Sequence, residues 1–140
     1  MDLILREGRP EDRLACARLF AAAQPLAYPA RRAALAGAAD FEAATRGEEL
    51  WIAEEAGRVR GLIAIYRPAR FIHHLYVDPG CLGRGIGRAL LTQGLRQCGG
   101  GADLKCDEAN RPAQAFYLAA GFQPVEWGWA PSGAWIRFRY

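Results

Sequence analysis

The sequence lacks any apolar run of the length that crosses a membrane. Such a helix needs about 20 consecutive apolar residues. The amino terminus, MDLILREGRPEDR, has only a short apolar run and no basic segment before it, so it does not resemble a secretory signal. We therefore expect a cytoplasmic protein with no membrane partner.

Cysteine is scarce, and its spacing argues against a zinc site and a disulfide framework. The four cysteines are Cys16, Cys81, Cys98 and Cys106. They form no C-x-x-C pair, and none has a histidine at zinc-ligand spacing. A chain of this size and class does not rely on disulfides for its core. We expect free, mostly buried thiols and no metal.

Lysine is almost absent, because Lys105 is the only one among 18 lysine and arginine residues. The formal net charge is a modest +3, and no basic run is interleaved with aromatic residues. Nucleic acid is therefore not an expected partner, whereas a small anionic ligand is compatible with this charge. A length of 140 residues with 51% hydrophobic and 24% charged residues predicts one globular domain, residues 1–140.

The residue pattern mixes strands and helices in the order β-α-α-β-β-β-α-β-α-β-β, which predicts an α/β fold with an antiparallel centre. The expected strands are residues 3–7, 50–54, 59–66, 71–77, 102–106, 123–129 and 134–140. The expected helices are residues 10–23, pieces of 30–46, 85–97 and 110–120. Pro25 and Pro29 are expected to end the first helix, and Asn110 to cap the last one.

The stretch GRGIGR, residues 83–88, is a glycine-rich turn before a helix. A Walker A loop would end in Gly-Lys-Ser/Thr, and a dinucleotide fingerprint would read G-x-G-x-x-G, so neither pattern fits. Glycine N–H groups and a helix N-terminus together bind phosphate well. Arg84 and Arg88 lie at the positive end of that helix, where a positive charge is slightly unfavourable. A bound anion there would make the interaction favourable. Solvated arginines beside an ordinary turn are the alternative.

Two segments, VDPGCLGRGIGRALL and NRPAQAFYLAAGF, resemble the GCN5-related N-acetyltransferase (GNAT) family. The family loop reads Arg/Gln-x-x-Gly-x-Gly/Ala, and residues 82–87 match it except that Leu82 replaces the first position. The second segment matches the pattern N-x-x-A-x-x-F-Y-x-x-x-G-F. The resemblance implies a mixed, mostly antiparallel central sheet flanked by helices, with strands 4 and 5 splayed to admit CoA.

The resemblance also implies acetyl-CoA as co-substrate and assigns residues to it. The strand residues would hold the pantetheine arm, the loop residues the pyrophosphate, and the later segment would lie beside the arm. These cofactor-binding candidates are Leu75, Tyr76, Val77, Leu82, Gly83, Arg84, Gly85, Ile86, Gly87, Arg88, Asn110, Phe116 and Tyr117.

Tyr117 is the candidate general acid. A phenol has a pKa near 10, above that of a typical thiol, so it can donate a proton to a departing thiolate. The alternative is a core tyrosine beside Phe116 on an amphipathic helix. A covalent route through Cys81 or Cys106 lacks an activating partner in the sequence.

His73 is the candidate base, because histidine titrates in the right range and some family members carry histidine at this place. Alternation puts Phe71, His73, Leu75 and Val77 on one strand face and Ile72, His74 and Tyr76 on the other. Other members carry glutamate where Phe71 stands. A structural role for either histidine stays open, and Glu48, Glu49 and Glu54 are remoter candidates acting through water.

These residues predict an N-acetyltransferase in which a primary amine attacks acetyl-CoA directly in a ternary complex. A small-molecule amine is the favoured acceptor, and a protein N-terminus or lysine is second. Leu82 and Phe71 favour the rival function, a non-catalytic acyl-CoA-binding module, whereas the intact segment with Asn110 and Tyr117 opposes it. Residues 24–47 are expected to cover the acceptor site. Trp127, Trp129 and Trp135 are interpreted as core or homodimer contacts, or as walls of the acceptor pocket.

Overall fold

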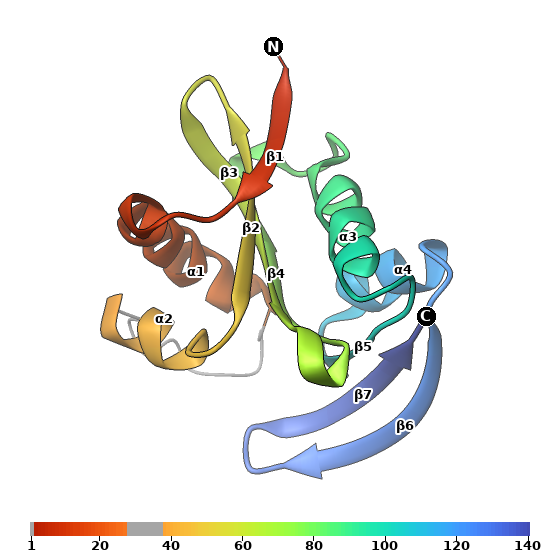
Figure 1. Ribbon diagram of the computed structural model, residues 1–140. Coiled ribbons are helices and arrows are strands. Elements are labelled where there is room, and N and C mark those ends of the chain that lie inside the picture. Colours follow the sequence, from red (N-terminus) through yellow and green to blue (C-terminus); the bar gives the residue numbers. More distant parts are fainter. Residues whose placement is uncertain (1, 28–37) are drawn as a thin grey trace.

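The computed structural model describes residues 2–27 and 38–140, and within these ranges seven strands form one sheet in the order β1-β2-β3-β4-β5-β7-β6 (Figure 1). The strands are β1 (Leu3–Glu7), β2 (Glu49–Glu55), β3 (Arg58–Tyr66), β4 (Phe71–Val77), β5 (Asp103–Asp107), β6 (Gln123–Ala130) and β7 (Gly133–Arg139). Of the neighbouring pairs in this described sheet, only β4 and β5 are parallel. The expected mixed, mostly antiparallel sheet is confirmed.

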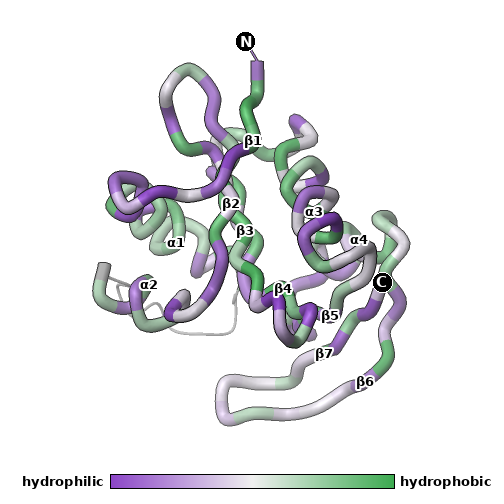
Figure 2. The backbone as a smooth tube through the Cα atoms, in the orientation of Figure 1, coloured by the Kyte–Doolittle hydropathy of each residue, from purple (hydrophilic) through white to green (hydrophobic). Residues whose placement is uncertain are grey.

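Helices cover both faces of the sheet and enclose two apolar cores. On one face lie α1 (Arg13–Ala27), which follows a short 3₁₀ turn, and α2 (Ala38–Ala44); on the other lie α3 (Ile86–Gln97) and α4 (Arg111–Ala119) (Figure 1). Phe20 and Phe41 fill the first core, whereas Leu90, Phe122 and Phe138 fill the second. Figure 2 shows the hydrophobic central strands lying between these helices.

The expected end of the first helix is wrong, because α1 continues through Pro25 to Ala27. Proline removes one backbone N–H, but its fixed φ is compatible with a helix, so the last turn can still form around it. Of the expected helical pieces within residues 30–46, α2 lies in the described part of the chain. Residues 28–37 lie outside the described residues.

Strand β4 contains a bulge at His73. Ala64 of β3 pairs with His74 and Ile65 pairs with Ile72, so His73 is an extra residue between them. A bulge inverts the alternation of side chains beyond it. Ile72 therefore joins the α3/α4 core with Leu75, and its predicted place on the face of His74 and Tyr76 is wrong.

Strands β4 and β5 separate soon after they meet. They pair only at Phe71 with Asp103 and at Ile72 with Leu104, and the rest of β4 turns away from β5. The predicted splay of strands 4 and 5 is confirmed. The opening lies beside α4, and it exposes backbone of β4 that a closed sheet would have paired.

Candidate functional site

The glycine turn joins β4 to α3 in a conformation that favours glycine. Gly83 and Gly85 have φ of 77° and 83°, in the left-handed region. Gly85 is the N-cap of α3 and has no side chain to satisfy the first turn. The first N–H groups of α3 therefore lack an intrahelical partner and point toward the loop, which suits an anion.

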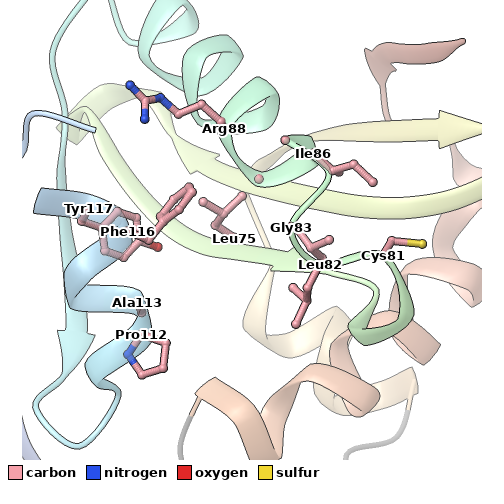
Figure 3. Close-up of a pocket in the computed structure, with 13 residues that line it drawn as sticks. Leu75, Cys81, Leu82, Gly83, Ile86, Arg88, Pro112, Ala113, Phe116 and Tyr117 are labelled. Atoms are coloured by element: carbon pink, nitrogen blue, oxygen red, sulfur yellow. The ribbon is translucent and has the colours of Figure 1, made fainter. Parts of the chain in front are cut away.

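A cavity of about 340 Å³, here called the loop cavity, lies between this turn and α4 (Figure 3). Its lining is mainly apolar, with Arg88 at the helix end. The lining residues are Leu75, Val77, Cys81, Leu82, Gly83, Gly85, Ile86, Gly87, Arg88, Pro112, Ala113, Phe116 and Tyr117. Most of the predicted cofactor residues are thus brought together. Cys81, Pro112 and Ala113 also line the cavity, although the sequence did not place them among the cofactor residues.

The two arginines of the turn differ in their surroundings. The Arg84 guanidinium pairs with Glu55 of β2, and this hydrogen bond raises the pKa of Arg84. Its positive charge is thus already balanced by a carboxylate, which weakens the interpretation that it awaits an anion. Arg88 lines the loop cavity, so it is the better placed of the two for an anionic ligand.

A second cavity, here called the splay cavity, occupies the opening between β4 and β5. Its walls come from the end of α1, from β4, from β5, and from α4 with its N-cap. The lining residues are Ala27, His73, His74, Leu75, Tyr76, Lys105, Cys106, Asp107, Asn110, Ala113 and Tyr117. The two cavities share Leu75, Ala113 and Tyr117. Lys105 and Asp107 gave no local sequence signal, since only the splay places them beside His73.

Tyr117 lies at the junction of the two cavities, held by an aromatic cluster. Its ring centroid is 5.3 Å from that of Phe116, 5.7 Å from Phe122 and 6.0 Å from Phe138. Figure 3 shows Phe116 and Tyr117 facing Leu75 across from the glycine turn. The side chain is therefore both a packed residue and part of the cavity wall, and its role as general acid stays a prediction.

Asn110 joins α4 to the end of α1. Its Oδ1 accepts a hydrogen bond from Ala113 N at 3.2 Å, which confirms the predicted N-cap. Its Nδ2 donates to the carbonyl of Ala27 at 3.2 Å. Asn110 thus lines the splay cavity, and Tyr76 does so as well, whereas neither lines the loop cavity.

The two histidines of β4 have different surroundings. His73 has a side chain that is 48% exposed, and its Nδ1 contacts Glu48. His74 is largely enclosed, and burial lowers its pKa. The Phe71 ring packs edge-on against His73 with centroids 4.8 Å apart. Both histidines line the splay cavity, and His73 is the more exposed of the two.

Comparison with known proteins places this arrangement in a family. A family model described as acetyltransferase (GNAT) family matches residues 14–122, well over half of the chain. The chain belongs to the GNAT acetyltransferase family. Peptidyl-lysine N-acetyltransferase YiaC of Escherichia coli (strain K12) is 37% identical over 79 residues, which cover 56% of this chain and 53% of the relative. The match thus spans about half the length of that relative.

Solved structures of other GNAT proteins share the fold at low identity. An N-acetyltransferase from Staphylococcus aureus Mu50 has a TM-score of 0.79 at 18% identity, covering 100% of this chain and 98% of its own. PaiA N-acetyltransferase from Thermoplasma acidophilum, in complex with coenzyme A, has a TM-score of 0.81 at 16% identity, covering 100% of both chains. YncA from Salmonella typhimurium, with acetyl-CoA, has a TM-score of 0.74 at 17% identity, covering 99% of this chain and 92% of its own.

The cysteines of this GNAT acetyltransferase are free and buried, as expected. Burial raises the pKa of the Cys106 thiol, which borders the splay cavity, to about 11. Because the thiolate is the nucleophilic form, Cys106 is a poor candidate for an acetyl-cysteine intermediate.

The tryptophans of β6 do not belong to the core. Trp127 is 62% exposed and Trp129 is 75% exposed, so the core interpretation is wrong for both. They lie on β6, an edge strand of the sheet, and strand alternation alone could not show this exposure. Within residues 2–27 and 38–140, no cluster of three His, Cys, Asp or Glu side chains is arranged for a metal ion. No helix in these same ranges has the length and apolarity to cross a membrane.

Proposed function

We propose that this GNAT protein transfers the acetyl group of acetyl-CoA to a primary amine. The observation that carries the proposal is the position of Tyr117, which borders the loop cavity and the splay cavity at once. A donor held in the first and an acceptor entering the second would meet at this side chain. The CoA and acetyl-CoA complexes of the T. acidophilum and S. typhimurium proteins support the choice of donor.

The residues of the loop cavity fit CoA chemically. A pyrophosphate needs several N–H donors and positive potential, and the glycine turn, the α3 N-terminus and Arg88 supply both. A pantetheine arm needs an apolar groove with backbone donors and acceptors, which Leu75, Val77 and Phe116 frame. Leu82 is 60% exposed beside the loop, so its replacement of Arg or Gln leaves this backbone cradle intact.

Each of the two proton transfers in the proposed reaction then has a candidate side chain. Bound acetyl-CoA would supply a thioester carbonyl that the amine attacks. Tyr117 would donate a proton to the departing thiolate, because a phenol, with a pKa near 10, still carries its proton at neutral pH. His73 would take a proton from the amine, since it faces the splay cavity and solvent. Backbone of β4 left unpaired by the splay would bind the arm of the donor.

The acceptor class has two candidates. A small-molecule amine is the first, because the splay cavity is narrow and partly enclosed by His74, Tyr76 and Asn110. A protein lysine is the second, favoured by the similarity to the peptidyl-lysine N-acetyltransferase of E. coli. A non-catalytic acyl-CoA-binding module remains the rival from a different class, and the shared position of Tyr117 argues against it.

Two measurements test the proposal. Acetyl-CoA at 100 times its Kd should stabilise the fold by about 2.7 kcal/mol, a rise in Tm of a few degrees. Adenosine at the same concentration, which has no pyrophosphate and no pantetheine arm, is the control. A panel of small amines and lysine peptides should then release free CoA thiol with at least one member. No stabilisation by acetyl-CoA would contradict the donor assignment. Binding without thiol release by any amine would instead support the non-catalytic module.

A further inference from the structure

A buried carboxylate lies directly behind the proposed base. Glu48 immediately precedes β2, and its side chain is only 3% exposed. Its Oε2 contacts His73 Nδ1, and its Oε1 lies 3.9 Å from His74 Nε2. Among the described residues, Oε1 has no hydrogen-bond partner. A buried, half-satisfied carboxylate is costly for a fold, so its retention beside two histidines calls for a chemical explanation.

The bulge in β4 brings both imidazoles to this carboxylate. Consecutive residues of a regular strand point to opposite faces, so His73 and His74 could not otherwise share one partner. The extra residue at His73 re-aims its side chain, and the two rings lie with centroids 5.9 Å apart. The arrangement around Glu48 is thus built by the strand irregularity itself.

His74 is already engaged by neutral partners. Its Nε2 lies 3.3 Å from the carbonyl of Ala44 and its Nδ1 lies 3.3 Å from the Tyr76 hydroxyl, which in turn accepts a hydrogen bond from Gln24 at 3.0 Å. Donation from Nε2–H to the carbonyl and acceptance at Nδ1 from the hydroxyl make a consistent neutral tautomer. Burial also lowers the pKa of His74. His73 is therefore the histidine whose protonation Glu48 can serve.

Other charged groups nearby have partners of their own or face the cavity. In the hollow on the other side of Glu48, Arg13 is bound to Glu42 at 2.7 and 2.8 Å, and Glu49 is bound to Arg67. Burial raises the pKa of the Glu48 carboxyl, and its contact with His73 opposes that rise. Among the described residues, the other charged or titratable groups that face Glu48 in that hollow are Glu7 and Arg9. Those that face His73 across the splay cavity are Lys105, Asp107, Tyr76 and Tyr117. Arg137 lies over the Phe71 ring, which packs against His73.

We propose that Glu48 is a positioning residue for His73. It accepts a hydrogen bond from Nδ1–H, which fixes the tautomer and leaves the Nε2 lone pair to face the splay cavity. When Nε2 takes the proton released by the attacking amine, the carboxylate stabilises the imidazolium without taking up a proton itself. The proton then leaves Nε2 for solvent, and Glu48 returns to its starting state. This inference rests on the proposed function, because it assigns a partner to the proposed base.

Kinetics of Glu48→Gln provide the first test. The amide keeps the size and an acceptor oxygen but removes the charge, so protonation of His73 becomes less favourable. We expect kcat to fall about 10- to 100-fold and the acid limb of the kcat/KM profile to move to lower pH by about one unit, with little change in the KM of acetyl-CoA. Glu42→Gln is the matched control, since its carboxylate binds Arg13 instead. The double variant Glu48→Gln/His73→Gln should be no slower than His73→Gln alone. Additive losses or an unmoved profile would overturn the proposal.

A tautomer measurement separates this inference from the proposed function, because it needs no turnover. In ¹⁵N NMR spectra of the histidine side chains, His73 of the wild-type chain should carry its proton on Nδ1 at neutral pH. Glu48→Gln should shift it toward the Nε2–H form that free imidazole favours, while His74 stays unchanged. A wild-type His73 protonated on Nε2 would contradict the role of Glu48 even if amines are acetylated. The expected Nδ1–H form in a chain that acetylates no amine would instead retain the pairing and reject the transferase. If Glu48→Gln does not fold, Glu48→Asp, which keeps the charge, should retain the wild-type tautomer.

Discussion

Individual side chains at the junction of the two cavities combine packing with chemistry. Tyr117 contributes its ring to the core with Phe122 and Phe138 while also bordering both cavities. Removal of its hydroxyl therefore leaves the ring contacts in place. This makes Tyr117 a residue at which a chemical role can be measured separately from stability.

Tyr117→Phe should lower kcat by about 100-fold or more, because general acid catalysis contributes factors of this size. The KM for acetyl-CoA and the Tm should change little, since the ring packing is retained. Steady-state kinetics with saturating acetyl-CoA measure the effect. Tyr140→Phe is the control, because its ring also contacts Phe122 but lies at the surface, 53% exposed. An unchanged kcat would remove Tyr117 from the mechanism.

At the scale of elements, the turn between β4 and α3 is the unit that prepares a phosphate site. It depends on left-handed backbone at Gly83 and Gly85, and among the described residues no atom lies within 4 Å of a Cβ built on either. A side chain would therefore meet backbone strain there and not a steric clash. The turn between β2 and β3 has the same property at Gly57, with φ of 75°, but lies outside the loop cavity.

Gly85→Ala should destabilise the fold by about 1–2 kcal/mol through the left-handed strain at its Cβ. Gly57→Ala should cost a similar amount, and thermal denaturation compares the two. Because Gly85 shapes the turn at the α3 N-terminus and Gly57 does not, we expect the KM of acetyl-CoA to rise about tenfold in Gly85→Ala but not in Gly57→Ala, as 1.4 kcal/mol corresponds to a factor of ten. Equal KM values in both variants would contradict a pyrophosphate site at this turn.

At the scale of the whole molecule, two buried aspartates each bind arginines of a neighbouring element. Asp12 binds Arg6 of β1 at 2.8 Å, and Asp103 of β5 binds Arg137 and Arg139 of β7, each at 2.8 Å. The hydrogen bond from Arg6 holds the pKa of Asp12 below its usual range, and those from Arg139 and then Arg137 do the same for Asp103. Both carboxylates therefore stabilise the fold in their charged form.

The stability of the protein should fall in acid as these two carboxylates protonate. Their folded pKa values lie below the unfolded value of about 3.9, so the stabilisation is complete above that pH and is lost as pH falls through the folded values. Asp12→Asn should lower the free energy of unfolding by about 1.5–3 kcal/mol at pH 7, and the difference from wild type should shrink as the pH falls below the unfolded pKa of about 3.9. Urea titrations across this range measure it, with exposed Glu108→Gln as control. A difference that is independent of pH would contradict a charge-based role.

Two expectations about the whole molecule stay predictions from the sequence, namely a cytoplasmic location and a homodimer. The exposed Trp127 and Trp129 on edge strand β6 are compatible with a contact between copies, and they no longer count as core residues.

Local sequence patterns determined much of this protein. The order of strands and helices, the N-cap at Asn110 and the glycine turn at residues 83–87 follow from propensities and spacings over a few residues, which is why they could be predicted. Two motifs in the right order predicted both the family and the splay between strands 4 and 5. The family model confirms the family, and the short pairing of β4 with β5 confirms the splay. The prediction failed locally where tertiary packing overrode a rule, as at Pro25 and in the face assigned to Ile72.

The tertiary structure alone decided which residues meet. Glu48 and His73 are 25 positions apart, and their contact depends on a bulge that strand alternation does not predict. The same holds for Lys105 and Asp107, which reach the splay cavity only because β4 and β5 part, and for Arg84, whose charge is taken up by Glu55. Sequence periodicity describes residues that are close along the chain. His73, the proposed base, and the carboxylate of Glu48 become neighbours only because strands that are far apart in the sequence pair with each other.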